Sequence, residues 1–161
     1  MTVDYTIAVS ALITAPPSAC YAAIADYRVA HPQIVPPKYF GPIVVLAGGV
    51  GAGTRATCSL RLMGKTYPFT FEVTEPVPGR VLVETNAGAG GVSTFTVVGE
   101  GASSARVTIE TRFPGRRGLR GVLERLVTRR VFPGIYAEEL RRLANYVGGA
   151  VVSSKTATAG G

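Results

Sequence analysis

The chain has 161 residues, of which 47% are hydrophobic, so it is long enough for one well-buried core and short for two ordinary domains. It begins MTVDYTI, which lacks a basic start followed by an apolar run, so we expect no secretory signal and a cytoplasmic protein. Glycines interrupt the uncharged stretch over residues 39–54, which argues against a membrane-spanning helix there.

The net charge of +7 lies mostly in one segment, because Arg116 to Arg142 contains eight arginines and three glutamates. A basic helix face attracts anionic membranes, acidic proteins or nucleic acid, although arginine also keeps an exposed helix soluble. No DNA-reading or RNA-reading motif accompanies the arginines, so we expect no nucleic-acid partner. Weak contact with an anionic membrane through this basic helix stays open.

Cys20 and Cys58 are too few for a disulfide scaffold, and neither has a neighbouring cysteine or histidine at metal-ligand spacing. The glycines at positions 49, 51 and 53 do not fit the G-x-G-x-x-G pattern, and a strand follows them where a dinucleotide site needs a helix. We therefore expect reduced cysteines, no bound metal and no cofactor.

The first element predicted is a strand over residues 3–13, where apolar residues occupy every second position. Ala15-Pro16-Pro17 ends this alternation and opens a short helix to about Tyr27, since proline is tolerated in a first helical turn. Residues 28–42 contain too many prolines for a long helix or a central strand, so we expect one helical turn and an irregular loop. The apolar residues of this loop suggest a lid.

Six further strands follow, each with alternating apolar and polar residues or with turn residues at both ends. They are predicted over residues 43–47, 55–62, 66–74 and 80–86, around 95–97, and over 106–113. Glycine-rich turns separate several of them, and the one over Gly48 to Gly53 is expected to need a positive φ. The pattern indicates a sheet with one apolar face and one polar face.

The last element predicted is a long helix over residues 116–147, with apolar residues at helical spacing. Pro133 removes a backbone hydrogen bond and collides with the preceding turn, so we expect a kink or break near Val131 to Pro133. Gly148 and Gly149 should end the helix. The domain is predicted to cover residues 1–149, with a disordered tail over 150–161.

This order of elements resembles the START-like or SRPBCC superfamily, and within it the polyketide cyclase/dehydrase-like group. The resemblance is carried by Ala15-Pro16-Pro17, Ala25-Asp26-Tyr27, the Gly51-Ala52-Gly53-Thr54 turn and Val73-Thr74-Glu75-Pro76. It implies an α+β helix-grip fold: a seven-stranded antiparallel sheet wrapped around a kinked C-terminal helix, with two short helices after the first strand. It also implies a hydrophobic cavity between the sheet and the helix. Members of the superfamily bind lipids, sterols, plant hormones or polyketides, so the resemblance implies a ligand of this kind.

The residues expected to contact a ligand are apolar or aromatic side chains of the predicted inner face, the lid and the long helix. They are Ile34, Tyr39, Phe40, Cys58, Leu60, Tyr67, Phe69, Phe71, Phe95, Ile109, Phe132 and Tyr136. Small residues opposite large aromatic ones are compatible with an internal void.

Few polar groups are expected on the inner face, namely Cys58, Thr85, Thr111 and the hydroxyls of Tyr67 and Tyr136. The alternation places Glu72, Glu84 and Glu110 on the outer face, so we expect no charged residue inside and no strongly ionic ligand.

The leading hypothesis is therefore binding of a hydrophobic small molecule such as a lipid or a polyketide, with its transport as an extension of that role. A polyketide cyclase or dehydratase is the alternative, with Tyr67, Tyr136, Tyr39 or His31 as weak candidates for proton donors or acceptors. A second alternative is a peripheral membrane protein that delivers lipid.

Overall fold

The computed structural model describes residues 3–160, which form one antiparallel sheet and three helices. The strands are β1 (Tyr5–Ile13), β2 (Val44–Ala47), β3 (Arg55–Leu62), β4 (Lys65–Val77), β5 (Val81–Asn86), β6 (Val92–Gly99), β7 (Ala105–Phe113) and β8 (Val151–Ala159). The helices are α1 (Pro17–Ala25), α2 (His31–Ile34) and α3 (Gly118–Tyr146). The sheet order is β2-β3-β4-β5-β6-β7-β1-β8.

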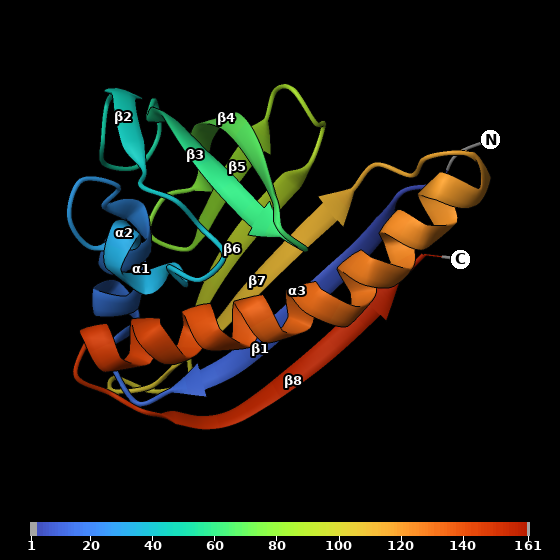
Figure 1. Cartoon of the computed structure of the whole chain (residues 1–161). Helices are drawn as coiled ribbons and strands as arrows, with labels where there is room; N and C mark the ends of the chain where they lie inside the picture. The colour runs from blue at the N-terminus through green and yellow to red at the C-terminus, as the bar shows by residue number, and fades with distance from the viewer. Residues whose placement is uncertain (1–2, 161) are drawn as a thin grey trace.

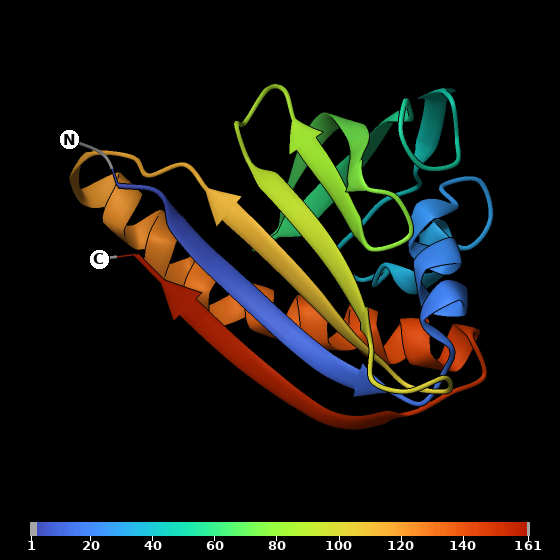
Figure 2. The same cartoon turned by 180° about the vertical axis from the view of Figure 1, so that it is seen from behind.

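The sheet curves around α3, which lies across its concave face, while α1 and α2 lie at one end (Figure 1; Figure 2). In β1 every second side chain, from Tyr5 to Ile13, is buried, as the alternation predicts. The second half of α3 contributes buried Phe132, Ile135 and Leu143 to the same core. The helix-grip architecture predicted from the sequence is thus confirmed.

The helix α3 is continuous from Gly118 to Tyr146, although Pro133 lies inside it. Figure 1 shows the helix changing direction near its middle, where a proline leaves one carbonyl without its helical donor. Of the two outcomes expected near residues 131–133, the helix therefore bends and does not break. Packing on both sides of the proline, at Phe132 and Ile135, holds the two halves in one element.

The predicted disordered tail over 150–161 is also wrong for most of its length, because Val151–Ala159 form the edge strand β8. This strand pairs with β1 from Ile13↔Val151 to Thr6↔Ala159. Its side chains are mostly exposed, so it shows no apolar alternation. Main-chain hydrogen bonds to β1 form the strand, and such bonds leave little signal in the side-chain pattern.

The glycine-rich turn before β3 fastens the end of α1. Gly51 has a φ of +61°, and a Cβ there would lie 2.4 Å from a carboxylate oxygen of Glu75. Its N–H donates to Ala25 O at 2.9 Å, and the N–H of Tyr27 donates to Gly49 O at 2.9 Å. The predicted positive φ is confirmed, and the turn fixes where Tyr27 enters the interior.

Candidate functional site

The sheet opens between β4 and β5. The two strands pair only as far as Phe71↔Asn86, so residues 65–70 of β4 extend past the end of β5. A pocket of about 580 Å³ lies at this opening. It is lined by Pro42, Thr57, Cys58, Ser59, Pro68, Phe69, Thr70, Asn86, Gly88 and Ala89. The lining includes Phe69 and Thr70, which are adjacent in β4 and therefore point to opposite faces of the sheet. The pocket thus extends around the part of the β4 edge that β5 does not cover.

A chain of aromatic rings leads from this pocket into the core. The ring centroids of Phe69 and Phe71 are 6.0 Å apart, and Phe71 lies 5.6 Å from Tyr27. Tyr27 stacks on His31 at 4.4 Å, and His31 meets the ring of Phe95 edge-on at 5.7 Å. These rings form an apolar wall that ends at ionisable groups.

Glu84 on β5 is the central ionisable group. The hydroxyl of Tyr27 donates a 2.5 Å hydrogen bond to its Oε1 atom. The Glu84 side chain is 17% exposed. Burial among protein atoms raises its pKa, and the nearby His31 offsets part of this increase. Burial and the Glu84 charge together raise the pKa of Tyr27 well above its ordinary value, so Tyr27 stays a proton donor.

His31 begins α2 and is 3% exposed. Its Nδ1 lies 2.6 Å from Ile24 O, and because a carbonyl can only accept, Nδ1 carries the proton. The other ring nitrogen, Nε2, faces Oε1 of Glu84 at 3.7 Å. The backbone of α1 therefore sets the tautomer that His31 presents to Glu84.

Glu139 on α3 brings a second carboxyl group into the core. It is 4% exposed, and within residues 3–160 no hydrogen bond contributes to the pKa of its carboxyl group. Burial, and then the charge of Glu84, raise its pKa well above the ordinary range. The protonated form of Glu139 is therefore favoured more than in a solvated glutamate.

A small void lies beside Glu139, between α3 and the sheet, and it has no room for a water molecule. It is lined by Ile24, Ile34, Phe95, Val107, Ile109, Glu139, Leu140 and Leu143. The larger pocket, in contrast, has no lining residue from α3 among residues 3–160. The expected space between sheet and long helix is thus filled at this end, and the open volume lies toward β3, β4 and β5.

Apart from the two carboxyl groups, the core contains a cluster of three hydrogen-bonded hydroxyls. Tyr136 Oη lies 2.5 Å from Thr111 Oγ1, which lies 2.8 Å from Ser93 Oγ. Burial raises the pKa of Tyr136 above its ordinary value, so the phenol stays protonated. The three hydroxyls satisfy one another inside the core.

The predicted ligand-contacting residues fall into several places. Cys58 and Phe69 line the larger pocket, whereas Ile34, Phe95 and Ile109 line the small void. Their role in binding a ligand stays a prediction.

The remaining predicted contacts line neither of these two spaces. Three are buried in the core and four are partly buried or exposed: Phe71, Phe132 and Tyr136; then Tyr39, Phe40, Leu60 and Tyr67. Tyr67 is 50% exposed. The predicted lid is held on β3, because Arg61 N–H donates to Tyr39 O at 2.7 Å and Gly41 N–H to Ser59 O at 2.9 Å.

The four candidates for proton transfer do not form one site. His31 lies beside Glu84, and Tyr136 binds Thr111. Tyr39 packs on the outside of the core, and Tyr67 is half-exposed on β4.

The sequence reasoning missed Tyr27, Glu84 and Glu139. Glu84 was predicted outside and Thr85 inside, and the structure reverses both: Leu82 is fully buried, so Glu84 shares its inner face. Val81, Leu82 and Val83 are all apolar, so the sequence does not indicate which side chains of this strand face the core. The expectation of no charged residue inside is thus wrong. The spacing of Glu139 from Phe132, Ile135 and Leu143 on α3 could have placed it inside.

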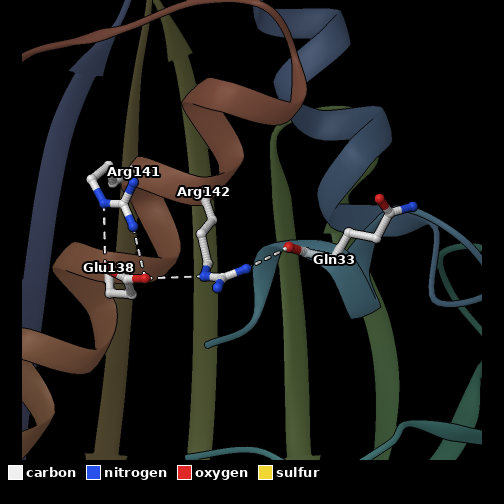
Figure 3. A network of polar contacts seen from close by, with 4 residues as sticks. All are labelled: Gln33, Glu138, Arg141 and Arg142. Atoms are coloured by element: carbon white, nitrogen blue, oxygen red, sulfur yellow. Dashed lines mark hydrogen bonds and ion pairs between the residues drawn. The ribbon is translucent and has the colours of Figure 1, made fainter. Parts of the chain in front are cut away.

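The arginines of α3 divide into two groups. In the second half, Glu138 Oε1 is 2.8 Å from Arg141 Nη2 and 3.1 Å from Arg142 Nε. Arg142 also donates to Gln33 O at 3.3 Å, which joins α3 to α2 (Figure 3). The contacts of Arg141 and Arg142 therefore stabilise the second half of α3 and its packing against α2.

The first half of α3 presents an exposed apolar stripe instead. Leu119, Val122, Leu123 and Leu126 are 86%, 50%, 61% and 61% exposed. Exposed arginines lie around this stripe, namely Arg116, Arg117, Arg120 and Arg130.

Within residues 3–160 no helix is long and apolar enough to cross a membrane. The same residues contain no cluster of three or more His, Cys, Asp or Glu side chains arranged to hold a metal ion.

Three solved structures are similar to this chain. The KanY protein, determined by NMR, is 32% identical, with a TM-score of 0.76 over 88% of this chain and 96% of that chain. The Zhui aromatase/cyclase from Streptomyces is 13% identical, with a TM-score of 0.70 over 90% and 94%. Norcoclaurine synthase from Thalictrum flavum, in complex with dopamine and hydroxybenzaldehyde, is 16% identical, with a TM-score of 0.70 over 91% and 87%.

A search of curated proteins gave no significant match. The sequence model of the family described as "Polyketide cyclase / dehydrase and lipid transport" matches residues 5–148. The match covers the sheet from β1 to β7 and all of α3. The chain therefore belongs to the polyketide cyclase/dehydrase and lipid transport family, within the START-like SRPBCC superfamily.

Proposed function

We propose that this protein binds an apolar small molecule in the pocket between β3, β4 and the turn after β5. The observation that carries the proposal is the pocket itself: about 580 Å³ is within the usual range for small-molecule sites. Cys58 and Phe69 supply its apolar inner wall, and Asn86 supplies a polar group. Membership of a family described by polyketide chemistry and lipid transport supports a ligand of this size and polarity.

The test is a binding screen by native mass spectrometry and by displacement of a fluorescent apolar probe. Lipids, sterols and aromatic polyketides form the panel. We expect at least one class to bind, and Ala89→Trp to block it, because Ala89 lines the pocket. Ala102→Trp, in the exposed turn between β6 and β7, is the control and should bind normally. Equal binding by both variants would contradict the location, and no binding by any class would contradict the function.

A second function, docking on an anionic lipid surface, is favoured by the exposed stripe on α3. Leu119 and Leu123 can enter the interface of a bilayer while the surrounding arginines contact acidic headgroups. Each basic residue near such a surface contributes about 1 kcal/mol. The occupant proposed for this face is therefore a membrane rich in phosphatidylserine.

Co-sedimentation with vesicles tests this second function. We expect binding to vesicles that contain phosphatidylserine, little binding to pure phosphatidylcholine, and loss of binding in Leu123→Ser. Val152→Ser on β8 is a matched control, since Val152 is 62% exposed and Leu123 is 61% exposed. Equal sedimentation with both vesicle types, or equal loss in both variants, would contradict docking through this face.

A further inference from the structure

The two carboxylate oxygens of Glu84 have unequal surroundings. Oε1 accepts the hydrogen bond of Tyr27 and faces Nε2 of His31. Within residues 3–160, Oε2 receives no hydrogen bond from the protein. The Glu84 side chain, which lies on the inner face of the sheet, is nevertheless 17% exposed. One oxygen is thus held by the protein, and the other is free for a ligand.

Glu84 lies close to the pocket along β5. Asn86 lines the pocket, and Glu84 is two residues earlier on the same strand, so both side chains point to the same face about 7 Å apart. Cys58 also lines the pocket, and the pKa of its thiol is raised by burial and, to a smaller extent, by the charge of Glu84. Glu84 itself does not line the pocket, so a molecule held beside Phe69 and Asn86 reaches it only by extending two residues along the inner face of β5.

The hydrogen bonding of His31 decides what Oε2 can do. Nδ1 donates to Ile24 O, so a neutral His31 presents a lone pair from Nε2 toward Oε1. Two facing lone pairs repel, and a proton on either Nε2 or Oε1 removes the repulsion. With the proton on His31, Oε2 is a carboxylate oxygen; with the proton on Oε1, Oε2 is a carbonyl oxygen. In both forms Oε2 accepts a hydrogen bond.

The geometry points to Glu84 Oε2 as the polar anchor of the pocket, which accepts a hydrogen bond from a phenol or enol hydroxyl of the bound molecule. This inference rests on the proposed ligand binding and specifies the ligand class: a neutral apolar or aromatic molecule with one hydroxyl donor. A carboxylate ligand is disfavoured when Glu84 is ionised, because two negative charges would then meet at Oε2. Tyr27 and His31 act as positioning residues.

Two probes of similar shape test the anchor by isothermal titration calorimetry at pH 7. 2-Naphthol has a hydroxyl donor, whereas 2-methoxynaphthalene has the same ring and oxygen without a donor. A hydrogen bond to a charged group supports an affinity difference of about tenfold or more, so we expect 2-naphthol to bind at least tenfold more tightly. 2-Naphthoate should bind more weakly than either.

The variant Glu84→Met should lower the affinity for 2-naphthol about tenfold and leave that for 2-methoxynaphthalene unchanged. Glu72→Met is the control, because Glu72 is exposed on the outer face of β4 and should change neither affinity. If Glu84→Met does not fold, the two probes on the natural protein still decide the question. Equal affinities there, or no binding of either probe, would overturn the anchor and leave the pocket standing, whereas the pocket is overturned only if the lipids, sterols and polyketides of the first screen also fail to bind.

Discussion

Glu84 on β5 and Glu139 on α3 oppose each other electrostatically, because the charge of Glu84 raises the pKa that burial has already raised at Glu139. Two carboxyl groups inside one apolar core cannot both ionise without a large cost. The interior therefore holds Glu139, whose protonated form is favoured, and a second carboxyl group, Glu84, which has its own partners, Tyr27 and His31.

Replacing Glu139 by Gln should stabilise the protein at pH 7. In the unfolded chain Glu139 ionises near its ordinary pKa of 4.5, and in the folded protein only at higher pH. Stability therefore falls as the pH rises above 4.5, and Glu139→Gln removes this fall. We expect a melting temperature a few degrees higher at pH 7, since about 1 kcal/mol corresponds to about 2–4 °C for this size of chain, and no difference at pH 4.

Glu138→Gln is the control for that experiment, because the neighbouring Arg141 lowers the pKa of Glu138. A lowered pKa favours the folded state above the ordinary pKa, so this substitution should slightly destabilise the protein at pH 7. Thermal unfolding followed by circular dichroism from pH 4 to pH 8 measures both variants. Lower stability of Glu139→Gln at pH 7 would mean that Glu139 is ionised and paired.

Tyr27→Phe should destabilise the protein by about 1.5–3 kcal/mol, because it removes the hydroxyl that donates to Glu84 and keeps the ring that stacks on His31. Urea unfolding at pH 7 measures the loss. Tyr67→Phe is the matched control, since Tyr67 is half-exposed, and its stability should change by less than about 0.5 kcal/mol. Equal effects of the two substitutions would argue against the Tyr27–Glu84 hydrogen bond.

Removing residues 151–161 should lower the melting temperature without abolishing pocket binding. The deletion exposes the edge of β1, which β8 covers from Thr6 to Ile13. The pocket residues lie on β3, β4 and the turn after β5, so probe affinity should stay within about twofold of the full chain, well under 1 kcal/mol. Unchanged melting and solubility after truncation would show that β8 contributes nothing to the sheet.

Arg142→Ala should disturb α2 more than Arg141→Ala does. Both arginines bind Glu138, but Arg142 also donates to Gln33 O in the turn that begins with His31 (Figure 3). The stability change should be small, about 0–1 kcal/mol, as for other partly exposed ion pairs. The informative measurement is the NMR signal of the His31 ring, which should shift in Arg142→Ala; equal shifts in both variants would contradict the link.

The sequence was sufficient for the fold because the pattern is repeated in most strands. The alternation in β1 and in β7 fixes which face is buried, and the helical spacing after Pro114 identifies α3. The edge strand β8 could not be predicted in this way, because its exposed small residues carry no alternation.

The site was much less predictable than the fold. The alternation fails where three apolar residues follow one another, at Val81 to Val83, and this hid the inward direction of Glu84. His31 was a candidate from the sequence, but its neighbours come from α1 and β5, which no local pattern brings together. The opening between β4 and β5 depends on strand register, which side-chain periodicity alone does not give.

The antiparallel pairing of Thr6 with Ala159 brings the beginning and the end of the described chain side by side, at the end of the molecule where α3 starts (Figure 1). A short linker can therefore join the two ends, and new ends can be opened in an exposed hairpin such as the turn between β6 and β7. The same arrangement allows a fluorophore or a solid support to be attached at either end without touching Phe69 or Asn86, so the protein can be converted into a sensor for the molecule that the pocket is proposed to bind.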